Sequence, residues 1–318
     1  MRPIPDMDTV QIELTDACMF SCSNCTRFCG HRLPWFMGEE DFKRAVDSMV
    51  DFPKMTGFMG GEPLLHPKFE EFCEYARSKI KKDKLGLWTC LPKGYERYAK
   101  CICDTFGHIF INDHSRNDIF HGPVLVAAEE IFTDKNEMFY VIDHCWLQNG
   151  WSASINRKGA FFCEIAAAMA ILFDTGSSWA VEPGWWWRTP KDFKEQIEEY
   201  CPKCGCAVPL ARRASVEGID DISPGNYERI KSFSKKIKKE QYKIHDLKMS
   251  TTEELNKQPM AAYKDTLYRS VIAARYSMCL AINEKNFQSP ILSKNILVRE
   301  KTIFQECKDQ MIRSQANV

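Results

Sequence analysis

The stretch Cys18-Met19-Phe20-Ser21-Cys22-Ser23-Asn24-Cys25 decides the fold, and it directly follows a strand-like run at residues 10–14. Three thiols in one short loop can wrap a single metal centre and leave one coordination position that the loop does not fill. A metal site with an open position can do chemistry, whereas a closed site is usually structural. The loop therefore predicts a reactive metal centre at the end of a strand.

The composition narrows the class of protein. Its 318 residues suffice for one large domain or somewhat more. Lys and Arg together number 43, as do Asp and Glu, so the net charge is zero. A nucleic-acid-binding protein would normally carry a surplus of basic residues, so we expect no nucleic-acid partner.

The cysteine usage indicates metal binding in a reducing compartment. The chain has 15 cysteines, an odd number, at clustered close spacings, and residues 1–6 do not read as an export signal. This combination argues against a disulfide scaffold, so we expect a cytoplasmic protein. The longest apolar run, residues 165–173, has about half of the length that crosses a bilayer, so we expect no membrane partner.

Strand-like and helix-like segments alternate through the first part of the chain. This alternation predicts repeated β-α units and a parallel sheet, which places its chemistry at the carboxyl ends of the strands. By hydrophobic periodicity we expect helices at residues 39–51, 67–80, 95–102 and 124–132. We expect strands at residues 10–14, 56–59, 85–89, 108–112 and 138–142.

The composition of the chain changes after about residue 143, where Gly, Trp and Cys become frequent. Strand-like and helix-like segments no longer alternate regularly there. We interpret residues 145–215 as a small metal-stapled module, that is, one held together by a bound metal centre. Beyond Ser223-Pro224-Gly225 the chain is charged and helix-prone, with a Lys-rich stretch near residues 231–248 that we interpret as a solvated helix face and an amphipathic helix at 258–283. We therefore expect three parts, at residues 1–143, 144–222 and 223–318.

Cys18, Cys22 and Cys25, followed by Gly60-Gly61-Glu62-Pro63, resemble the radical S-adenosylmethionine (SAM) superfamily over roughly residues 8–145. The two motifs agree with that family in kind, order and separation. The resemblance implies a partial (β/α)6 TIM-like barrel in which the three thiolates bind three irons of a [4Fe–4S] cluster. SAM then chelates the fourth iron, and the segment from Gly60 to Pro63 holds its amine.

In that family an electron from the cluster cleaves SAM, and the resulting 5′-deoxyadenosyl radical abstracts a hydrogen atom from the substrate. The resemblance therefore also implies an electron donor of the flavodoxin or ferredoxin type. One residue departs from the family pattern: many members have an aromatic residue just before the third cysteine, where this chain has Asn24. A structural zinc loop is the alternative interpretation of these cysteines.

A second set of cysteines looks like the shortened auxiliary-cluster module, called twitch, of the SPASM-type radical SAM enzymes. The resemblance implies a second [4Fe–4S] cluster, with Cys206 close by and four ligands at Cys145, Cys163, Cys201 and Cys204. The same four thiols could instead form a tetrahedral zinc site.

Relatives with one auxiliary cluster modify peptides, or oxidise or epimerise sugars and aminocyclitols. Only 17 residues precede Cys18, so we expect no peptide-recognition domain and a small polar substrate, similar in kind to those of the aminocyclitol dehydrogenases and aminoglycoside epimerases. Trp185-Trp186-Trp187-Arg188 could contact a sugar, although such aromatic clusters usually form a small core. The alternatives are radical modification of a peptide and a non-catalytic zinc-binding interaction protein.

Candidate polar residues follow the predicted strands. Asn112 and Ser115 are expected to contact the cofactor at the mouth of the barrel. Arg116 and Asp143 are candidates for the catalytic groups of an oxidation, and Glu13 is expected to face inward. Epimerisation needs a thiol that donates a hydrogen atom, for which Cys206 is the first candidate, with Cys90 and Cys29 as the others.

Overall fold

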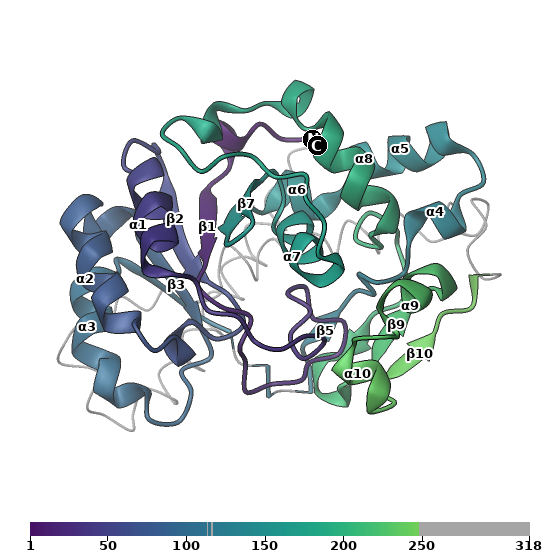
Figure 1. The fold of residues 1–318 in the computed structure, drawn as a ribbon, viewed down its shortest axis with the longest axis horizontal. Coiled ribbons are helices and arrows are strands. Elements are labelled where there is room, and N and C mark those ends of the chain that lie inside the picture. Colours follow the sequence, from purple (N-terminus) through teal and green to yellow (C-terminus); the bar gives the residue numbers. More distant parts are fainter. Residues whose placement is uncertain (113, 116, 248–318) are drawn as a thin grey trace, which may run out of the picture.

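A six-stranded sheet forms the centre of the protein in a computed structural model that describes residues 1–112, 114, 115 and 117–247 (Figure 1). Its strand order is β4-β3-β2-β1-β6-β7. All neighbouring strands are parallel except the last pair, β6 and β7. The strands are β1 (Thr9–Glu13), β2 (Met55–Met59), β3 (Leu85–Thr89), β4 (His108–Ile111), β6 (Ala153–Asn156) and β7 (Gly159–Phe161). The mixed α/β class and four of the predicted strands are thus confirmed.

Three helices follow the first three strands and lie along the left side of the sheet in Figure 1. They are α1 (Glu39–Ser48), α2 (Phe69–Lys79) and α3 (Ala99–Thr105). Acidic residues in the first turn of α1 complement the positive end of its dipole. The apolar faces of α1 and α2 meet through Phe42 and Phe72, whose rings stack with centroids 3.8 Å apart. The helices predicted at 39–51 and 67–80 are confirmed, and the one predicted at 95–102 begins as a 3-10 turn, Tyr95–Tyr98.

The strand predicted at 138–142 is wrong, because these residues belong to α5 (Lys135–Asp143). Met138 and Ile142 are buried four positions apart on one helix face, and the Asp134 side chain caps the helix at the amide of Asn136. A short apolar run fits either structure, and here the helical period applies. The helix predicted at 124–132 is also mostly wrong, because only α4 (Ala128–Ile131) is helical.

The strand next to β1 comes instead from the region expected to be the metal-stapled module. In β6, Ala153 and Ser154 pair in parallel with Val10 and Gln11. The strand leads through β7 into α7 (Glu164–Phe173), which is apolar all round and almost entirely buried. Two further helices belong to this region, α6 (Trp146–Gly150) and α8 (Lys194–Tyr200).

Short elements follow residue 212 and lie at the lower right of Figure 1, close to the loop after β1. They are β8 (Arg213–Ala214), which pairs with β5 (Phe120–His121), and β9 (Asp220–Ile222), which pairs with β10 (Tyr242–Ile244). Two short helices, α9 (Pro224–Ile230) and α10 (Lys235–Lys238), lie between them. The helix predicted at 258–283 lies outside the described residues. Further 3-10 turns are Ile4–Asp6, Pro63–Leu65, Lys82–Lys84, Trp185–Trp187, Pro190–Asp192, Cys201–Lys203 and Ser215–Glu217.

The aromatic cluster after residue 184 is mainly core. Trp185 and Trp186 are buried, and the indole nitrogen of Trp186 donates a hydrogen bond to the Ser48 carbonyl. Trp187 is 65% exposed. This arrangement matches the small-core interpretation rather than a shared sugar-binding face.

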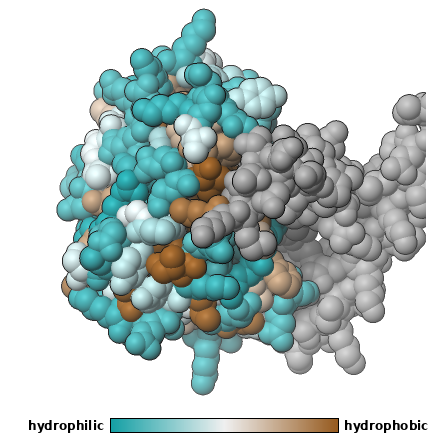
Figure 2. Space-filling view, turned by 90° about the vertical axis from the view of Figure 1, so that its right-hand side faces the viewer, coloured by the Kyte–Doolittle hydropathy of each residue, from teal (hydrophilic) through white to brown (hydrophobic). Residues whose placement is uncertain are grey.

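The surface on the side of α4, α5 and β10 is mostly hydrophilic, with a band of apolar residues (Figure 2). Among the helices described, none combines the length and the hydropathy of a membrane span.

Candidate functional site

Both predicted motifs line one pocket at the carboxyl edge of the sheet. Cys18, Cys22 and Cys25 line it from the loop after β1, and Gly60, Gly61 and Glu62 line it from the end of β2. The ends of β3 and β4 add Thr89, Cys90 and Asn112. The carboxyl ends of parallel strands meet at one edge, which is why segments far apart in the sequence converge here. We call this the cysteine-loop pocket.

Gly60 and Gly61 bring β2 against the backbone of the cysteine loop. A Cβ atom at Gly60 would lie 2.2 Å from the Thr15 carbonyl oxygen, and one at Gly61 would lie 2.3 Å from that of Ala17. The Gly61 and Glu62 amides donate 2.7 Å hydrogen bonds to the same two carbonyls. The close approach that the glycines permit is therefore first of all an approach to protein backbone.

The Glu62 carboxylate joins the ends of β2 and β3. It is 1% exposed and accepts hydrogen bonds from the amides of Leu64 (3.1 Å) and Cys90 (2.8 Å), the Thr89 hydroxyl (2.7 Å) and the Cys90 thiol (2.9 Å). Burial, together with the negative charge of Glu62, raises the pKa of Cys90. Cys90 is therefore a protonated thiol inside the pocket.

A fourth loop cysteine, Cys29, lies in the same pocket and is 3% exposed. Hydrogen bonding with the Cys29 thiol lowers the pKa of both Cys18 and Cys25, and the same bonds raise the pKa of Cys29. Burial raises the pKa of Cys22 to about 12, and its sulfur lies 3.6 Å from Nδ1 of His114. Two of the three predicted ligands thus favour the thiolate form that binds metals.

Residues from the far end of the described chain hold the cysteine loop from behind. The Lys236 ammonium is 1% exposed and donates to the Cys22 carbonyl (2.9 Å) and to both oxygens of Asp220 (2.9 and 2.8 Å). Asp220 also accepts from the Asn24 amide at 2.6 Å and contacts His31 at 2.8 Å. Burial would raise the pKa of Asp220, but the hydrogen bond with His31 and the charge of Lys236 lower it.

The interpretation of residues 231–248 as a solvated helix face is therefore wrong at Lys236. Only Lys235–Lys238 is helical in the described part of this stretch, and Lys236 points inward to an acidic partner. This inward position of Lys236 could not be predicted from neighbouring residues, because its partners Cys22 and Asp220 lie 214 and 16 residues away in the sequence.

Asn24, the residue that departs from the family pattern, has a structural reason to be asparagine. Its φ is 49°, in the left-handed region that asparagine tolerates better than most residues. Its side chain exchanges hydrogen bonds of 3.0 and 2.8 Å with the carboxylate and amide of Asp221. Arg213 in turn holds that carboxylate at 2.7 and 2.9 Å.

A buried charged group lies beside the loop on the inner face of the sheet. Arg27 lines the cysteine-loop pocket and pairs with Glu13 at 3.4 Å and with Glu164 at 3.1 Å. It also donates to the side chain of Gln11 at 2.5 Å. Burial raises the pKa of Glu13 to about 7 despite the opposing charge of Arg27. Glu13 faces inward as expected, while Arg27 and Glu164 were not predicted.

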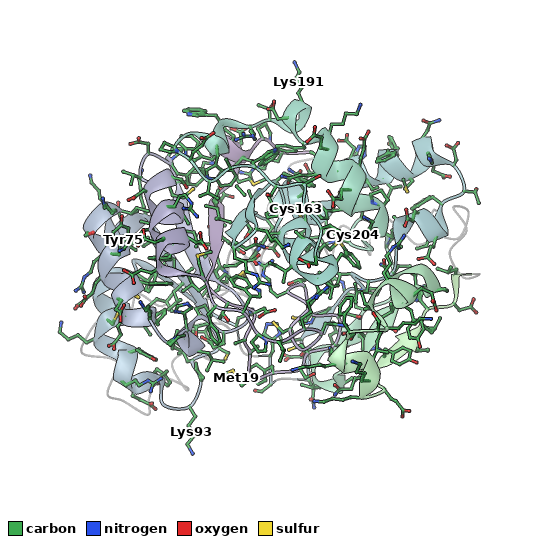
Figure 3. All side chains as sticks on the ribbon, viewed as in Figure 1. Met19, Tyr75, Lys93, Cys163, Lys191 and Cys204 are labelled. Atoms are coloured by element: carbon green, nitrogen blue, oxygen red, sulfur yellow. The ribbon has the colours of Figure 1, made fainter. Side chains whose placement is uncertain are left out.

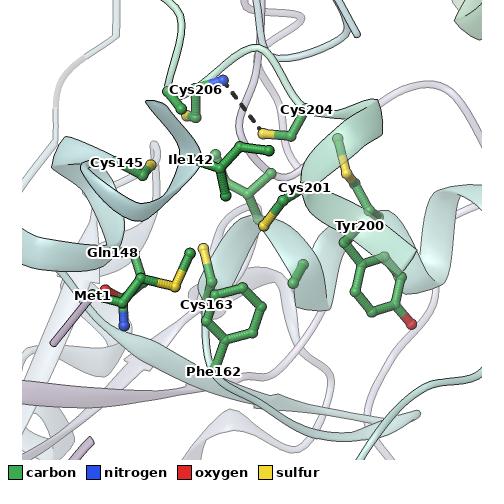
Figure 4. A pocket seen from close by; sticks show the side chains of 14 residues that line it. Met1, Ile142, Cys145, Gln148, Phe162, Cys163, Tyr200, Cys201, Cys204 and Cys206 are labelled. Carbon is green, nitrogen blue, oxygen red and sulfur yellow. Dashed lines mark hydrogen bonds between the residues drawn. The ribbon is translucent and has the colours of Figure 1, made fainter. Parts of the chain in front are cut away.

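The second cysteine set also lines a single pocket. Cys145, Cys163, Cys201, Cys204 and Cys206 surround it, as Figure 4 shows. Figure 3 shows Cys163 and Cys204 in the interior of the molecule, away from Met19 of the cysteine loop. Cys145 and Cys163 precede the first turns of α6 and α7, and the Cys206 amide donates to the Cys204 sulfur at 3.4 Å. We call this the second cysteine pocket.

One ion pair connects the two pockets. Arg27 lies two residues after Cys25, and Glu164 directly follows Cys163. Their side chains meet at 3.1 Å, and Arg27 also donates to the Glu164 carbonyl at 3.1 Å. In the described part of the chain, no three His, Cys, Asp or Glu side chains are placed to hold a single metal ion, so the metal ligands stay predictions.

The other predicted site residues lie in different places. Cys206 is in the second cysteine pocket, not beside the cysteine loop. Asp143 ends α5 with its side chain 64% exposed, and it accepts from the N-terminal ammonium at 3.2 Å. Asn112 lines the cysteine-loop pocket, and Ser115 is exposed nearby in sequence. Arg116 lies outside the described residues.

No protein-family model matches the chain, and no curated protein matches it. Among solved structures it is similar to the crystal structure of BtrN in complex with AdoMet and 2-DOIA, at 12% identity and a TM-score of 0.40. That match covers 62% of this chain and 92% of the other. It is also similar to selenomethionine BtrN in an open conformation, at 13% identity and a TM-score of 0.40, over 65% of this chain and 96% of the other.

Proposed function

We propose that this protein is a radical SAM enzyme that abstracts a hydrogen atom from a carbohydrate or another small polar metabolite and so oxidises or epimerises it. The observation that carries the proposal is the shared pocket of Cys18, Cys22 and Cys25 with Gly60, Gly61 and Glu62. When bound, the cluster supplies an electron that cleaves SAM, and the radical fragment takes the hydrogen atom. The electron itself would come from a flavodoxin- or ferredoxin-type partner.

The residues of the pocket fit this cofactor by their chemistry. Thiolates are the ligands that iron–sulfur clusters require, and the pKa values of Cys18 and Cys25 are lowered. Cys22 would be the third ligand, held in place through its carbonyl by Lys236. Asn112, whose side chain is exposed at the end of β4, is a candidate for contact with SAM.

The second cysteine pocket would hold an auxiliary [4Fe–4S] cluster through Cys145, Cys163, Cys201 and Cys204. Its proposed role is to accept the electron that an oxidation releases after hydrogen abstraction. The Arg27–Glu164 pair supports this role, because it joins a residue that lines the cysteine-loop pocket to the residue that directly follows Cys163. Cys206 is then a neighbour of that cluster.

Epimerisation would need a thiol that returns a hydrogen atom to the substrate. Cys90 is better placed for this than Cys206, because Cys90 lines the cysteine-loop pocket and Cys206 lines the second cysteine pocket. Oxidation and epimerisation are separated by running the reaction in deuterated water. Deuterium at a carbon of the product indicates return of hydrogen from a thiol, and an oxidised product without deuterium indicates dehydrogenation.

Metal content and SAM cleavage test the proposal. Anaerobic reconstitution should give about eight irons per chain for two four-iron clusters. The reduced protein should release 5′-deoxyadenosine from SAM, and Cys22→Ala should abolish the release. Cys103→Ala is the matched control, because Cys103 is buried in α3 and lines neither pocket.

Stoichiometric zinc without iron would instead favour the zinc-binding interaction protein. Release of 5′-deoxyadenosine that persists in Cys22→Ala would remove the cysteine loop from the mechanism. Activity on a peptide, with none on sugars or cyclitols, would favour radical modification of peptides.

A further inference from the structure

The inner face of the sheet has a flat aromatic floor beside the cysteine-loop pocket. Gly57 of β2 and Gly86 of β3 are paired neighbours, and neither has a side chain to cover the sheet. The indole of Trp88 occupies that space: a Cβ atom at Gly57 would lie 2.1 Å from its ring, and one at Gly86 would lie 3.2 Å from it. Trp88 also stacks on Phe110 with ring centroids 4.3 Å apart.

Three buried nitrogen donors around this floor have no hydrogen-bond partner among the described residues. They are Nε1 of Trp88, Nε of Arg27 and Nε2 of Gln11. These residues are 6%, 7% and 0% exposed. A buried donor without a partner is costly, so such groups commonly indicate an absent ligand or water. Both Trp88 and Arg27 line the cysteine-loop pocket.

The position in the pocket distinguishes Trp88 from other tryptophans. Trp35, Trp151 and Trp185 also have buried indole nitrogens without a partner among the described residues. None of these three lines the cysteine-loop pocket. Among the described residues with an unpartnered indole nitrogen, only Trp88 therefore lines the cysteine-loop pocket, which Arg27 lines as well.

We infer that Trp88 and Arg27, with Gln11 behind them, form a substrate subsite for a hydroxyl-rich small molecule that carries no anionic group. The inference rests on the proposed function, since it assigns the subsite to the substrate of the same pocket. All three unpartnered groups are donors, so the ligand must supply acceptor oxygens, which hydroxyl groups do.

The charges around Arg27 exclude an anionic ligand. The guanidinium already pairs with Glu13 and Glu164, both of which are 3% exposed. Arg27 is thus already paired with Glu164, so a phosphate or carboxylate entering the subsite would find no free cation and would meet the like charge of that carboxylate in a desolvated place. A neutral polyol or an amino sugar meets no such repulsion.

Binding to the reconstituted full chain in the presence of SAM tests the subsite. The probes are myo-inositol, glucosamine and glucose 6-phosphate, measured by saturation-transfer NMR and calorimetry. We expect myo-inositol or glucosamine to bind and glucose 6-phosphate to bind at least about tenfold more weakly. Trp88→Phe keeps the ring and removes the donor, so it should weaken binding about fivefold.

Arg27→Lys keeps a cation but removes Nε, and we expect a loss of about tenfold or more, since the lost donor is charged. Trp35→Phe is the matched control, because Trp35 is equally buried, has an unpartnered indole nitrogen and lies outside the pocket. It should leave the affinity unchanged. Circular dichroism shows whether Arg27→Lys folds. If it does not, the comparison of Trp88→Phe with Trp35→Phe still tests the subsite.

Three results would overturn the subsite. Glucose 6-phosphate could bind most tightly, none of the probes could bind, or Trp88→Phe and Trp35→Phe could have equal effects on binding. Iron content and 5′-deoxyadenosine release are measured on the same samples without a polyol. Loss of both in the wild type would refute the proposed function, whereas normal cleavage without polyol binding would refute only the subsite.

Discussion

The two glycines after β2 hold the cysteine loop by leaving room for its backbone. The sequence motif predicts that Gly60 and Gly61 contact the cofactor. Their contacts show that they also let the backbone after β2 pack against the backbone after β1. The motif could be found because a Gly-Gly pair after a strand is a strong local signal. Its contact with Thr15 and Ala17 could not be found, since it depends on how the loop folds back.

Gly61→Ala should therefore displace the loop. The new Cβ would lie 2.3 Å from the Ala17 carbonyl oxygen, and that backbone must move to admit it. We expect a loss of about 1–3 kcal/mol in the free energy of unfolding and a lower iron content. Gly176→Ala is the control, because nothing lies within 4 Å of a Cβ there. Equal urea midpoints and equal iron in the two variants would contradict this account.

Glu13 predicts a pH dependence of stability. Its pKa is raised from 4.5 to about 7, so the folded protein holds this proton more tightly than the unfolded chain does. The contribution to stability is full below pH 4.5 and is lost as the pH rises to about 7. Glu13→Gln removes the titrating group and keeps its shape.

Urea unfolding at pH 5 and pH 7.5 measures this effect. Across that range the wild type should lose up to about 2.5 kcal/mol more stability than Glu13→Gln, because the pKa of Glu13 is about 7 in the folded protein and about 4.5 in the unfolded chain. Parallel pH profiles for the two proteins would show that the pKa of Glu13 is not raised.

At the scale of elements, α10 contributes one buried lysine to the site. Lys236 pairs with Asp220 at 2.8 Å while it holds the Cys22 carbonyl. Lys236→Met would leave the Asp220 carboxylate buried beside a neutral side chain. Removing one partner of a buried ion pair typically costs about 3–5 kcal/mol.

We therefore expect Lys236→Met to lower the free energy of unfolding by about 3–5 kcal/mol and to reduce iron uptake. Lys235→Met, at the exposed neighbouring position, should change neither. Urea denaturation and iron analysis of both variants provide the measurement. A stable, fully reconstituted Lys236→Met protein would mean that α10 does not hold the cysteine loop.

The elements that sequence could predict are those with long, regular periodicity. α1 and α2 were found because their apolar residues repeat at helical spacing over several turns, and β1, β2 and β3 were found as short strand-like runs that alternate with the helices. The run at 138–142 is as long as those strands, but five residues fit either period, and here they belong to α5. β6 was missed because it lies between cysteine-rich segments and only its pairing with β1 reveals it.

At the scale of the whole molecule, the two cysteine sets were predictable as sets, but their relation was not. The resemblance to the auxiliary-cluster module grouped Cys145, Cys163, Cys201 and Cys204 with Cys206 close by, and the structure places all five around one pocket. The Arg27–Glu164 pair between the pockets joins residues 137 apart, which no local pattern indicates. The same holds for the inner-face group around Trp88 and Arg27.

The two pockets share no lining residue, so each should hold its metal independently. The double variant Cys201→Ala/Cys204→Ala should reduce the iron from about eight to about four per chain, because only the second cysteine pocket loses ligands. Release of 5′-deoxyadenosine should continue, since Cys18, Cys22 and Cys25 are unchanged. Oxidation of substrate should stop if the auxiliary cluster accepts the electron. Unchanged iron would remove the auxiliary cluster from the proposal, whereas complete loss of iron would show that the two centres assemble as one unit.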